Sequence, residues 1–435
     1  MCRENFHKVL KINDLRAFLR PFLGARLALA VLVALFFAAC GGDSRGETSS
    51  RESRAGNAPL CSDSVQFYPL EYARLLRMGV SCGQPLAEIR SVVGRDTLVK
   101  RFVLVDSALA SDTATLRKLS AGREWAGAVP LRVPLRRVVV LSSAQLGFME
   151  RLGVESRIVG VGEGRYIVDS ALSARVSAGE IAEVGNGPNV SLEKVVSLKP
   201  DLVMTFATGG AYDDYERLAT LDIPLMLTSE WQEDTPFAKF DWISLFAKLF
   251  GVEPQAALVT KTYSGLIPDM AKKEADPLTA CRANGPRVIA GMAYGGVWYA
   301  PGGRSYTASL IRQAGGCYLW AGDTTREMKL SLEEIFAVAD SADVWVNPGI
   351  YGTPEEILAA EPRLERLKPF RAKRVCQNDA RKSAGGGNDF YEGAVSRPVE
   401  LGWNLHGCIF GEKAPKTGGK KPDEPYRWYR NIYNF

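Results

Sequence analysis

Short apolar runs alternate with amphipathic segments through the middle of the chain. Residues 136–143 (RRVVVLSS) form a β-branched run between polar residues, which predicts a strand. Residues 144–153 (AQLGFMERLG) have the apolar spacing of a helix that ends at Gly153, and RIVGVG after them predicts a second strand. Alternating strands and helices with short loops favour a parallel sheet flanked by helices.

A second unit of this kind follows. Ser191 is a candidate N-cap for a helix over LEKVVSL, Pro200 ends that helix, and DLVMTF is a strand of the buried type. Residues 215–229 (YERLATLDIPLMLTS) add one more helix and one more strand.

The later part of the chain repeats this order. The strand PRVIAGMA starts at Pro286 and is followed by a glycine-rich aromatic loop, the helix SLIRQAGG, a helix over SLEEIFAVAD, and the strand DVWVNPG. Ser-Leu-Glu thus opens a helix before a strand in both halves, at Ser191 and at Ser331. The repetition predicts two similar α/β lobes.

Residues 253–276 lie between the two lobes and have roughly helical apolar spacing, with Pro254 near the first helical position. A helix of about 20 residues spans about 30 Å, which would limit how far the lobes swing. Pro268 is expected to kink or interrupt this connecting helix.

The N-terminus predicts export. Arg20 and Arg26 precede an apolar run of eleven residues, 27–37, which is shorter than the roughly 20 residues that span a bilayer. FAAC, ending at Cys40, resembles the lipobox of bacterial lipoproteins, so we expect cleavage after residue 39 and acylation of Cys40. The alternative is an ordinary cleavage site with an incidental cysteine. Residues 41–60 have almost no apolar content and predict a flexible tether, so that the anchor and tether together span residues 40–60.

Length and charge refine this division. The 435 residues, 46% apolar and 24% charged, exceed what a single core fills. Loss of residues 1–39 removes six basic and two acidic residues, so the formal net charge falls from +5 to +1. Such a chain is not a polycation, and its charge does not indicate nucleic-acid binding.

Six cysteines remain after Cys2 and Cys40 are set aside, and none lies in a CxxC motif, which makes a structural zinc site improbable. Disulfides suit an exported protein, but six cysteines allow fifteen pairings and the sequence does not choose among them. Our expectation is that neighbours in sequence pair: Cys61 with Cys82, Cys281 with Cys317, and Cys376 with Cys408.

The order RVVVLSS, RIVGV, a GxGN-like turn, SLEKVVSLKPDLV, a connecting helix, and a second lobe with PGG and SLEEI resembles the substrate-binding proteins of ABC importers for iron-siderophores and vitamin B12. The resemblance covers about residues 130–410. It implies a class III periplasmic binding protein, in which two Rossmann-like lobes are joined by a long helix and hold the ligand between them. The lobes would span residues 61–252 and 277–435. TLVKRFVLVD, near residue 100, suggests that the uncovered residues 61–130 add strands to the first lobe.

The resemblance also implies a docking role for one glutamate on each lobe, which would contact arginines of the permease. The Ser-Leu-Glu motif places this role on Glu193 and Glu333, with Glu334 as a neighbouring ambiguity. A structural explanation competes, because the helix dipole favours a glutamate in a first turn and Ser331 with Glu334 fits a capping box.

Ligand contacts are expected from loops at the carboxyl ends of the strands. Trp and Tyr on such loops suit a large planar ligand, and arginines suit carboxylates or anionic catecholates. Trp298 and Tyr299 rank first because glycines surround them, although any such aromatic can instead anchor its loop. Arg397, in the glycine-rich segment 381–398, lines the cleft mouth or belongs to an ordinary loop. The candidates are Ser142, Ser143, Arg165, Tyr166, residues 208–212, Trp231, Tyr294, Trp298, Tyr299, Tyr351 and Arg397.

His406 is the single histidine of the mature chain, so a multi-histidine site for a bare metal ion cannot form. This favours a chelated metal, an iron-siderophore or a corrinoid, over a free ion, with heme as another possibility. VGVGEG is a weak match to a dinucleotide loop, and no Walker A, HExxH or GxSxG motif occurs, although composition does not exclude a pair of catalytic carboxylates.

We therefore predict a lipid-anchored, monomeric, non-enzymatic protein of the periplasm or cell surface, without a cofactor, that delivers a metal chelate to an ABC permease in the inner membrane. A surface lipoprotein that captures its ligand without a permease is the alternative from another class.

Overall fold

The computed structural model describes residues 65–81, 83–107, 127–267, 270, 276–411 and 428–433. Contacts divide the chain into residues 1–60 and residues 61–435, and every described residue belongs to the second unit. The predicted signal segment, Cys40 and the tether lie outside the described residues. Among the helices that the structure describes, none is long and apolar enough to cross a membrane.

The first sheet is built from residues that precede the repeated α/β units. Its strands lie in the order β1-β2-β3-β4-β5, antiparallel except for the parallel pair β4–β5. One face of this sheet shares a core with helices of the first lobe, in which Ile89 and Phe102 are buried with Trp242. The predicted extra strands therefore exist, but they form a separate sheet, which we call the appended sheet. Its strands are β1 (Gln66–Phe67), β2 (Leu76–Ser81), β3 (Gln84–Val93), β4 (Asp96–Asp106) and β5 (Val129–Val133).

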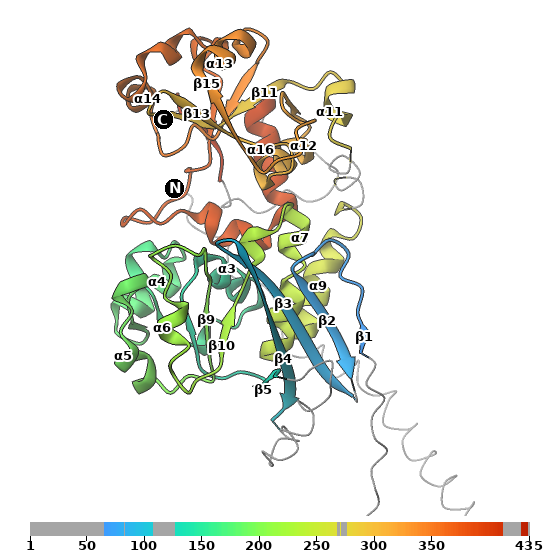
Figure 1. The fold of residues 1–435 in the computed structure, drawn as a ribbon, viewed down its shortest axis with the longest axis vertical. Coiled ribbons are helices and arrows are strands. Elements are labelled where there is room, and N and C mark those ends of the chain that lie inside the picture. Colours follow the sequence, from blue (N-terminus) through green and yellow to red (C-terminus); the bar gives the residue numbers. More distant parts are fainter. Residues whose placement is uncertain are drawn as a thin grey trace, which may run out of the picture. The chain divides into compact units, whose positions relative to one another are not determined.

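The first lobe contains the predicted parallel sheet. Its five strands have the order β10-β9-β6-β7-β8, and every pair is parallel. The strand order reverses between β6 and β9, so the crevice beyond their carboxyl ends is the expected ligand position. Figure 1 shows α4, α5 and α6 beside β9 and β10. The elements are β6 (Val138–Val140), α3 (Ser143–Leu152), β7 (Ile158–Val161), α4 (Ser170–Ser177), β8 (Ala182–Glu183), α5 (Leu192–Ser197), β9 (Leu202–Thr205), α6 (Tyr215–Leu218), β10 (Leu225–Leu227), α7 (Pro236–Phe240) and α8 (Ile243–Phe250).

The second lobe repeats this plan around another five-stranded sheet. Its order is β14-β11-β16-β17-β18, parallel except for β18. The central strand β11 pairs with β16 as β6 pairs with β9, and a Ser-Leu-Glu helix precedes both β9 and β16. The predicted two-lobe repetition is confirmed. The elements are β11 (Arg287–Ala290), α12 (Tyr306–Gln313), β14 (Cys317–Tyr318), α13 (Leu332–Ala339), β16 (Val344–Val346), α14 (Pro354–Ala360), α15 (Lys368–Arg371), β17 (Val375–Gln377), α16 (Pro398–Phe410) and β18 (Arg430–Asn431).

A three-stranded antiparallel sheet replaces the predicted glycine-rich loop of the second lobe. Its order is β12 (Met292–Tyr294), β13 (Val297–Pro301) and β15 (Glu327–Ser331). Gly295 and Gly296 form the turn between β12 and β13, and both have positive φ, at 57° and 79°. A two-residue turn with two positive φ angles joins strands into a tight hairpin, and glycine adopts it without steric cost.

Local capping follows the predictions. Gly153 ends α3 in the left-handed conformation. The Ser191 hydroxyl accepts a hydrogen bond from the Lys194 N–H at the start of α5. Ser331 and Glu334 form a reciprocal capping box at the start of α13.

The link between the lobes differs from the predicted long helix. Helix α9 (Glu253–Tyr263) is followed by a turn over residues 264–266, where Ser264 and Gly265 are poor helix formers. The helix therefore ends before Pro268, which itself lies outside the described residues.

A second link is helix α16. Val399 at its start belongs to the first-lobe core, whereas Leu401, Leu405 and Ile409 belong to a second-lobe core. One helix thus contributes apolar surface to both lobes.

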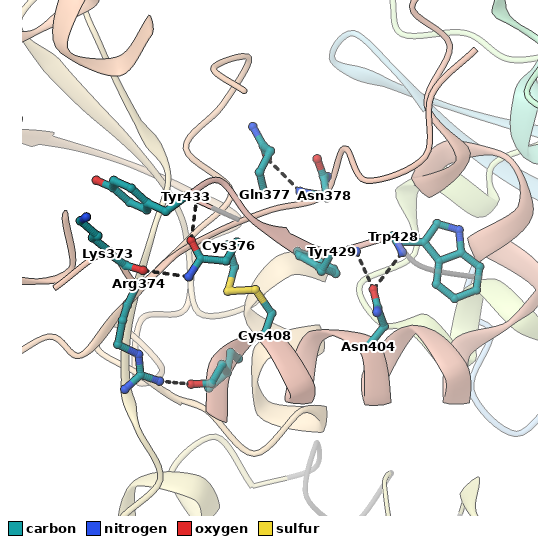
Figure 2. Close-up of a disulfide and its surroundings, with 12 residues drawn as sticks. Lys373, Arg374, Cys376, Gln377, Asn378, Asn404, Cys408, Trp428, Tyr429 and Tyr433 are labelled. Carbon is teal, nitrogen blue, oxygen red and sulfur yellow. Dashed lines mark hydrogen bonds between the residues drawn. A yellow bond between two sulfur atoms is a disulfide. The ribbon is translucent and has the colours of Figure 1, made fainter. Parts of the chain in front are cut away.

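Two of the three expected disulfides lie within the described residues. Cys281 pairs with Cys317 and Cys376 pairs with Cys408, as expected, whereas Cys61 and Cys82 lie outside. Figure 2 shows the Cys376–Cys408 bond, which joins β17 to α16, and the Asn404 side chain, which accepts hydrogen bonds from the backbone N–H groups of Trp428 and Tyr429. These contacts hold α16 against the sheet of the second lobe.

Candidate functional site

A hollow of about 370 Å³ lies at the crevice edge of the second lobe. It is lined by Gly291, which follows β11, and by Asn347, which follows β16. These are the two strands between which the strand order reverses, and open α/β sheets bind ligands at this point. Gly291 has a φ of 112°, and a Cβ atom there would lie 2.1 Å from the Tyr299 carbonyl oxygen. The hollow therefore depends on glycine at this position.

Aromatic and cationic side chains line the same hollow. Tyr299 comes from β13, Tyr306 begins α12, and Arg326 precedes β15. The Ser305 hydroxyl caps α12 by accepting a hydrogen bond from the Ala308 N–H at 3.1 Å. This lining combines two phenol rings with a guanidinium group.

Two residues of the first lobe reach the lining of this hollow. Asp234 forms an ion pair with Arg326 at 2.7 Å. The Lys239 ammonium group, on α7, lies 4.1 Å from the centre of the Tyr306 ring. The hollow therefore lies where the two lobes meet, as expected for a ligand held between them.

A buried carboxylate, Glu230, lies near Lys239 in the first lobe. Glu230 begins a 3₁₀ helix, η5 (Glu230–Gln232), and is fully buried, with no well-formed hydrogen bond to either oxygen among the described residues. Burial raises the pKa of the Glu230 carboxyl, and the nearby Thr228 hydroxyl and Lys239 ammonium oppose this effect. Burial also lowers the pKa of Lys239 to about 8, against the attraction of Glu230 and Glu233. At neutral pH the ammonium group is still mostly charged.

The crevice edge of the first lobe carries an exposed aromatic pair. Trp231, in η5 after β10, is 41% exposed, and Phe206, directly after β9, is 38% exposed. Their ring centres are 6.2 Å apart in an edge-to-face arrangement. Trp231 was among the predicted ligand residues, whereas Phe206 was not. Its position directly after a buried strand was the available signal.

Arg165 and Tyr166 lie close together on the loop after β7. The Arg165 guanidinium pairs with Glu163 at 2.7 Å and lies 4.6 Å from the centre of the Tyr166 ring. The Ser383 hydroxyl donates a hydrogen bond of 2.6 Å to the Arg165 carbonyl oxygen, which joins this loop to the second lobe. The remaining first-lobe candidates are Ser142, before α3, Ser143, which begins α3, and the loop of residues 208–212, in which Tyr212 is 84% exposed.

Three of the second-lobe candidates are tyrosines, and each has a different environment. Tyr299 lines the hollow, and Tyr294, at the β12–β13 turn, is 68% exposed. Tyr351 packs in part against the core, and its carbonyl oxygen accepts a hydrogen bond from Gln377.

Trp298 and Arg397 are corrected by the structure. Trp298 is fully buried, packs against Trp345 at 5.3 Å, and donates its indole N–H to the Ala290 carbonyl oxygen. The alternation along β13 points Trp298 into the core and leaves Tyr299 at the hollow. Arg397 is 3% exposed and forms two hydrogen bonds with Glu150 of α3, at 3.0 and 2.9 Å. It contacts the other lobe and is not available to a ligand.

A second contact between the lobes centres on Glu392. Its carboxylate accepts backbone hydrogen bonds from Val168 and Asp169, at 3.0 and 2.7 Å. Gly147 on α3 lies so close that a Cβ atom there would be 1.9 Å from the Glu392 carbonyl oxygen. Sequence patterns gave no signal for this contact, because it joins residues more than 220 positions apart.

The two predicted docking glutamates occupy equivalent places. Glu193 is exposed in the first turn of α5, and Glu333 is exposed in the first turn of α13, 4.0 Å from Arg363. Glu334 bonds to Ser331 within the capping box, and these hydrogen bonds lower the pKa of its carboxyl. Glu333 is therefore the less engaged of the two neighbouring carboxylates.

Comparison with known proteins places this architecture in a family. Residues 138–381 match the family model described as periplasmic binding protein. An uncharacterised lipoprotein of Methanocaldococcus jannaschii is 26% identical over 265 residues, which are 57% of this chain and 61% of that protein. The match thus spans less than two thirds of this relative's length.

The chain is also similar to two solved structures that are named as binding proteins. A periplasmic binding protein from Veillonella parvula is 14% identical, with a TM-score of 0.49 over 75% of this chain and 98% of that chain. A periplasmic heme binding protein from Pseudomonas aeruginosa is 17% identical, with a TM-score of 0.48 over 65% of this chain and 96% of that chain.

The family match begins at the first strand of the first lobe, β6, and leaves the appended sheet outside it. It spans both β6 and β11, the central strands of the two lobes, and it confirms the resemblance inferred from the repeated Ser-Leu-Glu units. It also confirms that the chain is a binding protein and not an enzyme. The chain belongs to the periplasmic binding protein family.

Proposed function

We propose that this protein is the solute-binding component of an ABC importer and captures a metal chelate between its lobes, with a ferric siderophore as the first candidate. The observation that carries the proposal is the hollow at the β11 and β16 ends, which Asp234 and Lys239 approach from the other lobe. Its volume of about 370 Å³ lies at the lower end of the range of small-molecule sites.

The chemistry of the lining supports an anionic or aromatic chelate. Tyr299 and Tyr306 offer ring faces and phenol groups, Lys239 supplies positive charge, and Arg326 adds a guanidinium group that is paired with Asp234. A guanidinium group binds carboxylates and catecholates through paired hydrogen bonds.

Heme and a corrinoid are the alternative ligands of the same site. His406 does not favour heme at this hollow, because it lies on α16 and is not among the residues that line the hollow.

Ligand titration tests this part of the proposal. Intrinsic tryptophan fluorescence of the full chain in detergent should be quenched in a saturable manner by one of four probes: a ferric tris-catecholate, a ferric tris-hydroxamate, cyanocobalamin or hemin. Tyr306→Ala should weaken that response by roughly tenfold, because one ring face and its cationic neighbour are lost. Tyr68→Ala, at an exposed tyrosine of the appended sheet region, is the matched control. No response to any probe would refute a chelate ligand.

Delivery to a permease is the second part of the proposal. We propose that Glu193 and Glu333 dock with the permease and that acylated Cys40 anchors the chain to the membrane. Their shared place at the start of α5 and α13 supports a paired contact with a two-fold permease. Capture by a surface lipoprotein that uses no permease is the alternative.

A double variant separates these two roles. Glu193→Arg with Glu333→Arg should abolish chelate uptake by cells and leave chelate binding by the purified protein unchanged. Glu216→Arg with Glu355→Arg, which reverses one first-turn glutamate in each lobe away from the motif, is the control. Full uptake in the docking variant would favour capture without a permease.

A further inference from the structure

The connection between β1 and β2 of the appended sheet holds the segment of the first lobe that approaches the hollow. The carboxylate of Glu233 accepts backbone hydrogen bonds from Arg74 and Leu75, and that of Asp241 accepts them from Tyr72 and Ala73. These bonds fix residues 233–241, which include both Asp234 and Lys239. The appended sheet therefore sets the position of the two first-lobe side chains that meet the lining of the hollow.

The β3–β4 hairpin also bonds to the first lobe at the crevice edge. The Gln232 carboxamide accepts from the Val92 N–H at 2.9 Å and donates to the Val92 carbonyl oxygen at 2.7 Å, as a neighbouring strand would. The Ser91 and Ser229 hydroxyls are 2.5 Å apart and buried. Both first-lobe partners lie beside the exposed Trp231.

The turn of this hairpin lies against the loop after β9. The Gly94 N–H donates to the Thr208 carbonyl oxygen at 3.1 Å. Gly209 packs so closely that a Cβ atom there would be 2.1 Å from the Gly94 nitrogen. Figure 1 shows the long β3 and β4 ribbons. Because β9 borders the reversal of strand order, the turn lies next to the expected ligand crevice.

The turn adds apolar and cationic surface at this edge. Val92 is 42% exposed, and its backbone N–H donates to Gln232, the neighbour of Trp231 in sequence. Arg95 is exposed at the turn and makes no ion pair with any residue that the structure describes. The nearby carboxylate of Asp213 is already bound by the backbone N–H groups of Thr208 and Gly209.

We propose that the turn Val92–Arg95 is a third ligand-contacting segment of the site, and that Arg95 selects anionic chelates over neutral ones. The inference rests on the proposed function, since it concerns the ligand of the same crevice. The appended sheet then has two roles. It positions residues 229–241, and it presents the guanidinium group of Arg95 at this edge.

Two iron chelates of similar size and different net charge test the selection. A ferric tris-catecholate is trianionic, whereas a ferric tris-hydroxamate is neutral. Arg95→Glu in the full chain should weaken tris-catecholate binding by roughly tenfold and change tris-hydroxamate binding less than about twofold. Arg132→Glu, an exposed arginine on β5 of the same sheet, is the matched control and should leave both affinities unchanged.

A second variant tests the positioning role. Gln232→Leu removes both hydrogen bonds to Val92 and should weaken binding of both chelates to a similar degree, because the loop beside Trp231 loses its support. Hydrogen exchange gives an independent measure. The backbone amides of residues 92–95 should exchange more slowly in the presence of a chelate that binds than in its absence.

The outcomes separate the inference from the proposed function. If the unmodified protein binds neither iron chelate, the ferric-siderophore assignment of the proposed function fails and the inference fails with it. If it binds but Arg95→Glu matches the Arg132→Glu control and residues 92–95 gain no protection, the inference alone is overturned. Selective loss of the trianionic chelate supports both.

Discussion

At the scale of single residues, Trp298 shows how one side chain changes role with its strand register. Its ring is fully buried and packs against Trp345, so Trp298→Ala should destabilise the protein by about 3–5 kcal/mol. Chemical denaturation followed by circular dichroism measures this loss. Trp231→Ala, at a 41% exposed position, should cost less than about 1.5 kcal/mol.

The contrary result would restore Trp298 to the ligand site. An unchanged denaturation midpoint together with weakened chelate binding would mean that the ring is exposed in the working protein. Tyr299 lines the hollow, so Tyr299→Ala should differ from the result expected for Trp298→Ala. It should lose chelate binding and nearly retain the stability of the unmodified protein.

At the scale of elements, periodicity predicted the regular parts well. The parallel strands, the Ser191 and Gly153 caps and the Ser331–Glu334 box depend on residues close in sequence, and all are present. The β12–β13 hairpin was missed although Gly295 and Gly296 between alternating residues were a usable signal.

Features that depend on distant residues could not be predicted in this way. The Arg397–Glu150 pair and the crossing of α16 between two cores are set by tertiary packing, and no local pattern encodes them. The same limit applies to the site: strand ends indicated which loops to consider, but the meeting of Asp234 with Arg326 required the fold.

At the scale of the whole molecule, Glu392 makes the contact between the lobes sensitive to pH. Burial raises the pKa of its carboxyl to about 7, the Val168 and Asp169 N–H groups oppose this, and the negative charges of Asp389 and Asp169 reinforce it. The folded protein therefore binds a proton on this group more tightly than the unfolded chain does.

The free energy of unfolding should consequently fall as pH rises from about 4.5 to about 7, because in this window the folded state still holds a proton that the unfolded state has released. Above pH 7 this contribution is constant. Its full size is at most about 3 kcal/mol.

Glu392→Gln keeps an acceptor for the Val168 and Asp169 N–H groups but cannot titrate, so its stability should exceed that of the unmodified protein increasingly across this window. Urea denaturation at pH 5 and pH 7.5 measures the difference. Glu150→Gln, at the neighbouring contact between the lobes, controls for loss of a carboxylate there. Parallel pH profiles for the unmodified and Glu392→Gln proteins would show that this carboxyl stays ionised, and that its contact with Val168 and Asp169 is equally strong at both pH values.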